Sequence, residues 1–130
     1  MKKLIAVVTL FIFIIAFGVF ESAYISHTFT FLENQLKIVS AMLEKDDENI
    51  DTEENITHLK DLHTEWQKKT KVLKFFVWHT GIKDVEVGLS RITSYTEENN
   101  YTEAYVELNN LIDYSKHYKE DYRFSIQNIV

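Results

Sequence analysis

A long uncharged run near the start of the chain, residues 4–20, constrains the fold more than any other feature. Its sequence is LIAVVTLFIFIIAFGVF, seventeen residues that are almost all apolar. A helix of this length rises about 25 Å, close to the ~30 Å hydrocarbon core of a bilayer. Tyr24 suits the headgroup level beyond the run, and Lys2 and Lys3 can reach the opposite interface. The run therefore predicts a transmembrane anchor over residues 1–23.

The charges that flank this run predict its orientation. Two lysines and no acid precede it, whereas the twenty residues after Phe20 hold one lysine and two glutamates. The positive-inside rule then places the N-terminus in the cytoplasm and residues 24–130 outside the cell membrane, as an extracytoplasmic domain. The alternative is a cleaved signal peptide with its site at Ala16-Phe17-Gly18, which would give a secreted protein. The apolar residues Val19 and Phe20 continue past that site and favour the uncleaved anchor.

The rest of the chain has the composition and periodicity of an all-α domain. It contains no proline and only three glycines, so few residues interrupt a helix. From Ile25 onward, apolar residues recur in steps of four and three, a heptad pattern with no helix breaker after the apolar run. One helix over about residues 3–45 is therefore predicted. Its heptad residues are Ile25, Phe29, Leu32, Leu36, Val39 and Leu43.

A second helix is expected to start within the acidic segment 44–55. Asp51 is followed three residues later by Glu54, which resembles a capping box at a helix start. The apolar stripe behind it includes Leu59, Leu62 and Trp66. Gly81 is expected to end this helix as a left-handed cap.

Two shorter patterns predict a third and a fourth helix. Asp84 is expected to start the third helix, Gly88 lies in its interior, and the polar segment 97–100 ends it. Thr102 is expected to cap the fourth helix. Because short connections favour antiparallel neighbours, residues 24–130 are predicted to form an up-down bundle of about four helices.

This topology separates the charges of the bundle. Residues 44–54 and 96–103, at the distal end, hold ten acids and one lysine, whereas residues 67–83 hold five lysines and no acid. Basic residues among aromatics can rest on anionic headgroups, although cations also favour helix C-terminal turns when simply solvated. We expect contact with the lipid membrane, or with a membrane-protein partner, at this end. The candidate contact residues are Lys68, Lys69, Lys71, Lys74, Phe75 and Trp78.

The sequence contains no recognisable catalytic or cofactor-binding set. It lacks cysteine, a nucleophile elbow and a phosphate-binding glycine loop, and its net charge of −6 argues against a nucleic-acid partner. Four residues share one helix face with metal-ligand chemistry, but no second helix offers a matching set. We therefore expect this face to be solvated, and we expect no metal, no other cofactor and no enzyme activity. The four residues are Glu54, His58, Asp61 and Glu65.

Short motifs with a characteristic order extend over nearly the whole chain. They are MKKLI, Phe20-Glu21, Trp66, Lys68–Lys74, His79, Asp84-Val85-Glu86, Leu89-Ser90-Arg91-Ile92, Ser94-Tyr95, Glu103-Ala104, Glu107-Leu108 and Leu111. In these motifs the chain resembles an uncharacterised family of short single-span membrane proteins from spore-forming Gram-positive bacteria, classed as a domain of unknown function. The resemblance implies a membrane-anchored helical protein and carries over no activity.

Together these patterns predict a membrane-anchored, extracytoplasmic interaction or accessory protein that binds a membrane-protein partner or self-associates. A ligand- or cation-sensing bundle is the alternative, since the acidic distal end can bind cations loosely. Sensor bundles usually return through the membrane to signal, and only one span is predicted here.

Overall fold

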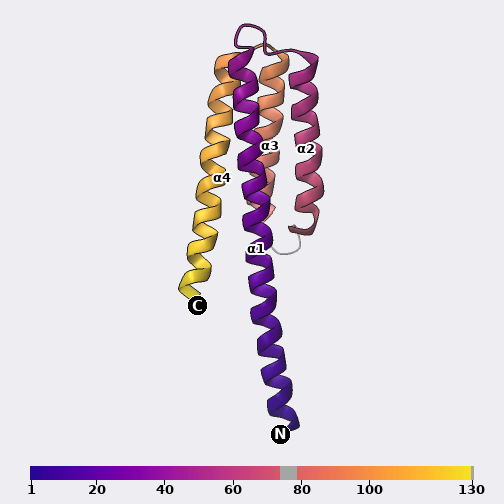
Figure 1. Ribbon diagram of the computed structural model, residues 1–130, viewed down its shortest axis with the longest axis vertical. Coiled ribbons are helices and arrows are strands. Elements are labelled where there is room, and N and C mark those ends of the chain that lie inside the picture. The colour runs from indigo at the N-terminus through magenta and orange to yellow at the C-terminus, as the bar shows by residue number, and fades with distance from the viewer. Residues whose placement is uncertain (74–78, 130) are drawn as a thin grey trace.

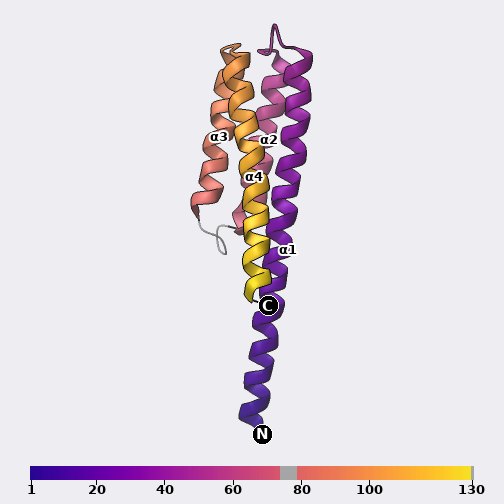
Figure 2. The same ribbon diagram turned by 90° about the vertical axis from the view of Figure 1, so that its left-hand side faces the viewer.

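Four helices form an antiparallel up-down-up-down bundle, from which the N-terminal half of the first helix projects alone (Figures 1 and 2). The computed structural model describes the backbone of residues 1–73 and 79–129, and their side chains except at 72, 79–80 and 121–129. The predicted all-α class and the long N-terminal helix are confirmed. The helices are α1 (Lys2–Lys45), α2 (Glu53–Leu73), α3 (His79–Glu97) and α4 (Tyr101–Ile129).

Helix α1 is continuous from the apolar run into the bundle, as its lack of proline favours. Within the described residues it is the one helix long and apolar enough to cross a membrane, with a mean hydropathy of 2.7 in its most apolar window. This criterion uses length and composition alone, and a signal sequence near the N-terminus would meet it equally.

The core begins where the heptad pattern begins. All six predicted heptad residues of α1, from Ile25 to Leu43, are buried, and they pack with buried apolar residues of the other three helices. Phe29 connects three helices, because Trp66 of α2 meets its ring edge-on at 5.5 Å between centroids and Tyr118 of α4 stacks on it at 4.5 Å. Burying each large apolar side chain contributes about 1.5–3 kcal/mol, which is the main source of stability in a domain without disulfides.

The helices follow one another around a ring. Each packs against the next in sequence and α4 returns to α1, whereas the diagonal pairs are not in contact within the described residues. Tyr105 bonds Glu44 near the top of α1, and Lys119 bonds Thr30 fourteen residues lower, which fixes an antiparallel register. Because both helices rise equally per residue, this register places the end of α4 beside about residue 20 of α1.

The structure corrects two predicted helix caps. Helix α2 is capped by Thr52 rather than by Asp51, since the Thr52 hydroxyl accepts the Asn55 N–H at 3.2 Å. Helix α4 is capped by Asn100 rather than by Thr102, because the Asn100 side-chain oxygen accepts the Glu103 N–H at 3.3 Å. In each case a neighbouring polar residue offers its oxygen at the position from which the second or third N–H can be reached.

The prediction for Gly81 is also wrong. Helix α2 is described to Leu73, and Gly81 lies inside α3, which starts at His79 rather than at Asp84. Gly81 has no positive φ, so it is not a left-handed cap. A Cβ at Gly81 would lie 2.7 Å from Cε2 of Tyr118, so the glycine is needed for the close approach of α3 and α4.

Asparagines close the distal end of the bundle. Asn99, with φ of 55°, forms the left-handed end of α3, where the N–H groups of Asn99 and Asn100 bond back to Thr96 and Tyr95 as in a Schellman motif. The Asn99 side chain also accepts the N–H of Ile50 at 2.9 Å. This bond holds the α1–α2 connection against the α3–α4 connection.

Candidate functional site

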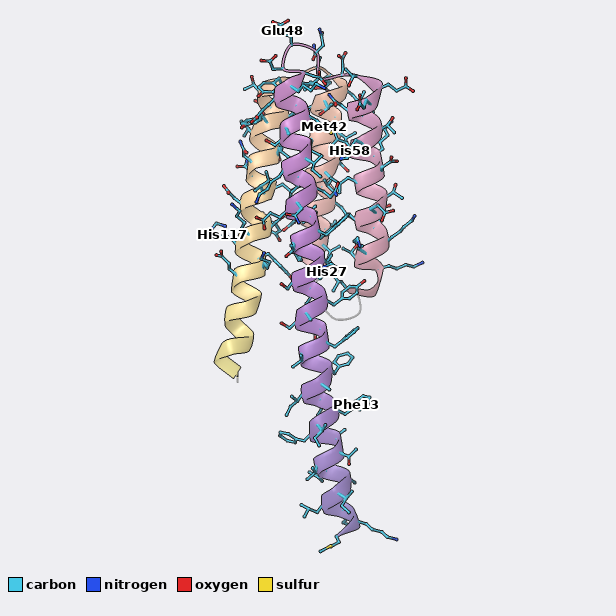
Figure 3. All side chains as sticks on the ribbon, viewed as in Figure 1. Phe13, His27, Met42, Glu48, His58 and His117 are labelled. Carbon is cyan, nitrogen blue, oxygen red and sulfur yellow. The ribbon has the colours of Figure 1, made fainter. Side chains whose placement is uncertain are left out.

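The change in burial along α1 marks the boundary of the candidate membrane-contact region. Every residue from 1 to 17 is exposed, and Phe13 leaves 71 % of its surface exposed on the projecting part (Figure 3). Ile25, in contrast, is fully buried. Between them Tyr24 donates a hydrogen bond from its hydroxyl to the backbone carbonyl of Lys69 at 3.0 Å. This bond ties α1 to the end of α2 close to the point where the apolar run stops.

Three of the six candidate contact residues lie in the described part of α2. Lys68 and Lys71 are exposed, and the Lys68 Nζ lies 3.7 Å from a carboxylate oxygen of Glu65. Lys69 turns toward α1, where its Nζ lies 4.5 Å from the centre of the Phe31 ring in a cation–π contact. Lys69 therefore packs between two helices, while Lys68 and Lys71 face solvent. The residues outside the described part are Lys74, Phe75 and Trp78.

An ion-pair cluster joins α1 and α4 in the same half of the bundle. The Glu33 side chain, only 12 % exposed, lies 3.2 Å from Lys37 Nζ and 3.7 Å from Lys119 Nζ. Lys119 also donates to the Thr30 hydroxyl at 3.3 Å. Because the Glu33 carboxylate is largely removed from water, salt screens these contacts less than those of a surface pair. The cluster helps to hold α4 beside α1 above the projecting segment.

Tyr114 and Tyr118 of α4 have raised pKa values. Burial raises the pKa of Tyr118, whose ring stacks on Phe29. Burial also raises the pKa of Tyr114, and the Asp84 carboxylate, 3.5 Å from the Tyr114 hydroxyl, raises it further. Both hydroxyls therefore stay protonated at neutral pH, and neither serves as a general base there.

Shallow hollows lie between neighbouring helices. One, of about 540 Å³, lies between α2 and α3, and its lining residues include Lys83 and Arg91. Arg91 belongs to α3, and its Nη1 lies 3.9 Å from Oε1 of Glu107 on α4. In the described part of the chain, no three His, Cys, Asp or Glu side chains gather as a metal-binding group. This includes the helix face from Glu54 to Glu65.

A family model described as a domain of unknown function, DUF4363, matches residues 19–129. The chain belongs to this family. The match to a domain of unknown function agrees with the resemblance seen in the sequence, whereas membrane attachment and bacterial source remain predictions. The comparison with curated proteins and the comparison with solved structures gave no match.

The extent of the DUF4363 match agrees with the architecture. It starts at residue 19, so it includes the last two residues of the apolar run and all of the bundle that follows. The family domain is therefore the bundle, including the part of α1 that packs against the other helices.

Sequence reasoning missed two residues that organise the DUF4363 bundle. Tyr24 was expected at the headgroup level, but its bond to the Lys69 carbonyl was not foreseen. Asn99 was expected only to help end the third helix, yet it also holds the α1–α2 connection through Ile50. Two consecutive asparagines after a helix are a sequence signal for a left-handed end followed by a new cap.

Proposed function

We propose that this protein is a single-pass, membrane-anchored accessory protein without catalytic activity, whose bundle stands on the extracytoplasmic face. The observation that carries the proposal is the change in burial along α1. Its large apolar side chains from Leu4 to Phe20 are exposed, whereas its heptad residues from Ile25 onward are buried in the core. The same helix thus has one part suited to lipid and one part suited to a folded domain.

Energetics supports placing the projecting part of α1 in lipid. Thirteen large apolar side chains between Leu4 and Phe20 are exposed. Removing each from water contributes about 1.5–3 kcal/mol, so transfer of this segment into hydrocarbon contributes tens of kcal/mol. A free chain would expose this surface and associate with other chains.

The ends of the other helices are compatible with a membrane surface near Phe20. Helix α4 ends beside about residue 20 of α1 in the register described above, and Tyr24 lies against the end of α2. The described parts of α2, α3 and α4 therefore stand beside the amphipathic part of α1. The excess of lysine before the apolar run supports a cytoplasmic N-terminus.

A basic surface at this end supports contact with anionic lipid headgroups or with a membrane-protein partner. Lys68 and Lys71 of α2 are exposed there, and Lys83 is exposed near the start of α3. A lysine close to an anionic surface contributes about 1 kcal/mol to binding. Since Lys69 packs on Phe31, the described residues that support this contact are Lys68, Lys71 and Lys83.

The absence of cysteine makes the topology directly testable by cysteine labelling in intact cells. Single cysteines are placed at the exposed positions Lys3 and Asn109, one on each side of the proposed span. A membrane-impermeant maleimide should label Asn109→Cys in intact cells and Lys3→Cys only after permeabilisation. The reverse pattern, or equal labelling of both, would refute the proposed orientation.

The mass of the mature chain tests whether the anchor is retained. An anchored protein stays in the membrane fraction after carbonate washing and keeps residues 1–18. A mature chain that begins after Gly18 and appears in the medium would show secretion and refute the anchor.

A further inference from the structure

A groove runs along the bundle between α1 and α2, beside the buried face of α1. Two hollows, of about 440 Å³ and about 170 Å³, open along it, and His58 and Asp61 of α2 line both. Met42 of α1 borders the first hollow and Phe31 of α1 borders the second. Met42 and His58 are labelled on these two neighbouring helices in Figure 3. The two hollows are therefore parts of one elongated surface.

The α1 wall of this groove has the spacing of a helix-packing strip. Phe31, Gln35 and Met42 line the hollows, and Ile38 lies between them in steps of four, three and four along α1. Ile38 leaves 46 % of its surface exposed, and the other three are half-buried. Residues at this spacing lie on one side of a helix and together span about 17 Å, or three turns. The strip can therefore receive side chains from another helix.

The α2 wall carries an excess of negative charge. The only ion pair that these carboxylates make within the described residues is between Glu65 and the exposed Lys68. Glu53, Glu54 and Asp61 thus make no ion pair within the described residues, whereas Lys69 lies over Phe31 beside the lower hollow. The four carboxylates that line the hollows are those of Glu53, Glu54, Asp61 and Glu65.

His58, which lines both hollows, has one ring nitrogen without a hydrogen-bond partner among the described residues. His58 Nε2 is buried and makes no hydrogen bond to any group of the described residues. Buried polar atoms in folded proteins are nearly always hydrogen-bonded. Because Nε2 is covered in this structure, an occupant of the groove contacts the accessible part of His58 rather than this atom.

We propose that the α1–α2 groove binds a cationic amphipathic helix of a partner protein. Its apolar side chains pack on Phe31, Ile38 and Met42, and its lysines or arginines face the carboxylates of α2. A second copy of this chain, anchored in the same orientation, would bring its own acidic distal end to this level and is less complementary. The proposal rests on the proposed function in one respect, that the partner is a protein at the same membrane.

The test uses the full chain in an uncharged detergent and a synthetic peptide of known sequence. The probe is a labelled peptide of about 18 residues, enough for three turns and frayed ends, with leucine at heptad positions and lysine elsewhere. A peptide with glutamate in place of lysine is the charge control. Fluorescence anisotropy measures the Kd of each peptide at two salt concentrations.

Matched variants distinguish the groove from nonspecific attraction to an acidic protein. Ile38→Asn replaces an exposed apolar side chain of the strip. Val106→Asn is the control, because Val106 is similarly exposed, at 48 %, but lies on α4 away from the groove. Loss of a central apolar contact should weaken binding of the lysine peptide about tenfold for Ile38→Asn, against less than about twofold for Val106→Asn. Both positions are exposed, so both variants should keep the fold, which circular dichroism checks.

A second pair of variants tests the charge. Replacing Glu54 and Asp61 together by their amides should weaken the lysine peptide about tenfold and lower its salt dependence. The same two-charge change at the exposed residues Glu98 and Glu103 should have little effect. Equal losses in both pairs, no loss from Ile38→Asn, or equal binding of the glutamate peptide would each overturn the proposal. Because the assay contains no membrane, these outcomes are independent of the labelling test of the proposed function.

Discussion

Substitutions of Asn99 separate two contributions that this residue makes to the distal end of the bundle. Its side chain accepts the Ile50 N–H at 2.9 Å and donates to the Glu48 carbonyl at 3.3 Å, while its backbone occupies the left-handed region with φ of 55°. Asn99→Gly keeps the left-handed backbone and removes both hydrogen bonds. Asn99→Ala removes the hydrogen bonds and also forces a Cβ residue without a local polar side chain into the left-handed region.

The expected losses follow from these contacts. Leaving the part-buried Ile50 N–H without its acceptor should lower the free energy of unfolding by about 1–2 kcal/mol in Asn99→Gly. The left-handed backbone should add about 1 kcal/mol in Asn99→Ala, for a total of about 2–3 kcal/mol. This is a large fraction of the ~5–15 kcal/mol that stabilises a typical domain.

Urea unfolding of residues 21–130, followed by circular dichroism, measures these differences. This fragment retains every buried core residue of the described bundle, from Ile25 to Leu111. Asn109→Ala, at an exposed position of α4, is the control and should change stability by less than about 0.5 kcal/mol. If Asn99→Gly is as stable as the unchanged fragment, the side-chain bonds contribute nothing. Equal losses in the glycine and alanine variants would refute the backbone part of the reasoning.

Three further predictions concern the packing of α4. Gly81→Ala places a Cβ 2.7 Å from Tyr118 and should lower the free energy of unfolding by about 1 kcal/mol, despite the better helix propensity of alanine. The control is Gly18→Ala, where a Cβ meets nothing within 4 Å and stability should not change. Urea unfolding of the full chain in detergent measures both. Glu33→Gln weakens the largely buried contact with Lys119 and should cost about 1 kcal/mol in the same assay, with no loss refuting a role for the cluster. Because the folded-state pKa of Tyr118 is raised, the stabilisation from its neutral hydroxyl is complete below pH ~10 and is lost as the pH rises above that value. The melting temperature should therefore fall above pH ~10, and it should fall less in Tyr118→Phe.

Periodicity predicted the core well, because burial repeats with the helix. Every heptad residue predicted for α1 is buried, and so are Leu59, Leu62 and Trp66 in the predicted stripe of α2. A helix that packs on one side must repeat its apolar residues every three to four positions, so this part of the fold is encoded locally. The acidic distal end was likewise found where the polar turns predicted it.

Helix ends were predicted less well, since several neighbouring residues have the chemistry of a cap. Asp51 and Thr52 can both accept an N–H bond, and only the path of the backbone places the Thr52 hydroxyl within 3.2 Å of its donor. Gly81 illustrates a second ambiguity. A glycine suits both a left-handed end and a close helix contact, and here the ring of Tyr118, 37 residues later in the sequence, decides between them.

The α1–α2 groove could not be predicted from the sequence, for a related reason. Phe31 directly precedes the core residue Leu32, and the acids of α2 match the pattern of an ordinary solvated face. Only the packing of α1 beside α2 brings an apolar strip and an acidic face to the two sides of one surface. The burial of His58 Nε2 without a hydrogen-bond partner among the described residues likewise follows from the packed structure.

The continuity of α1 sets the direction of any helix that binds in this groove. The helix runs without interruption from the projecting segment to Lys45, and the bond from Tyr24 to Lys69 couples it to α2 where the bundle begins. The groove therefore keeps a fixed angle to the proposed span instead of turning on a flexible linker. Its lower end, at Phe31, lies about 16 Å along α1 from Phe20. In the proposed orientation, a partner reaches it with a helix that extends from the bilayer surface alongside α1, or with one that descends from above.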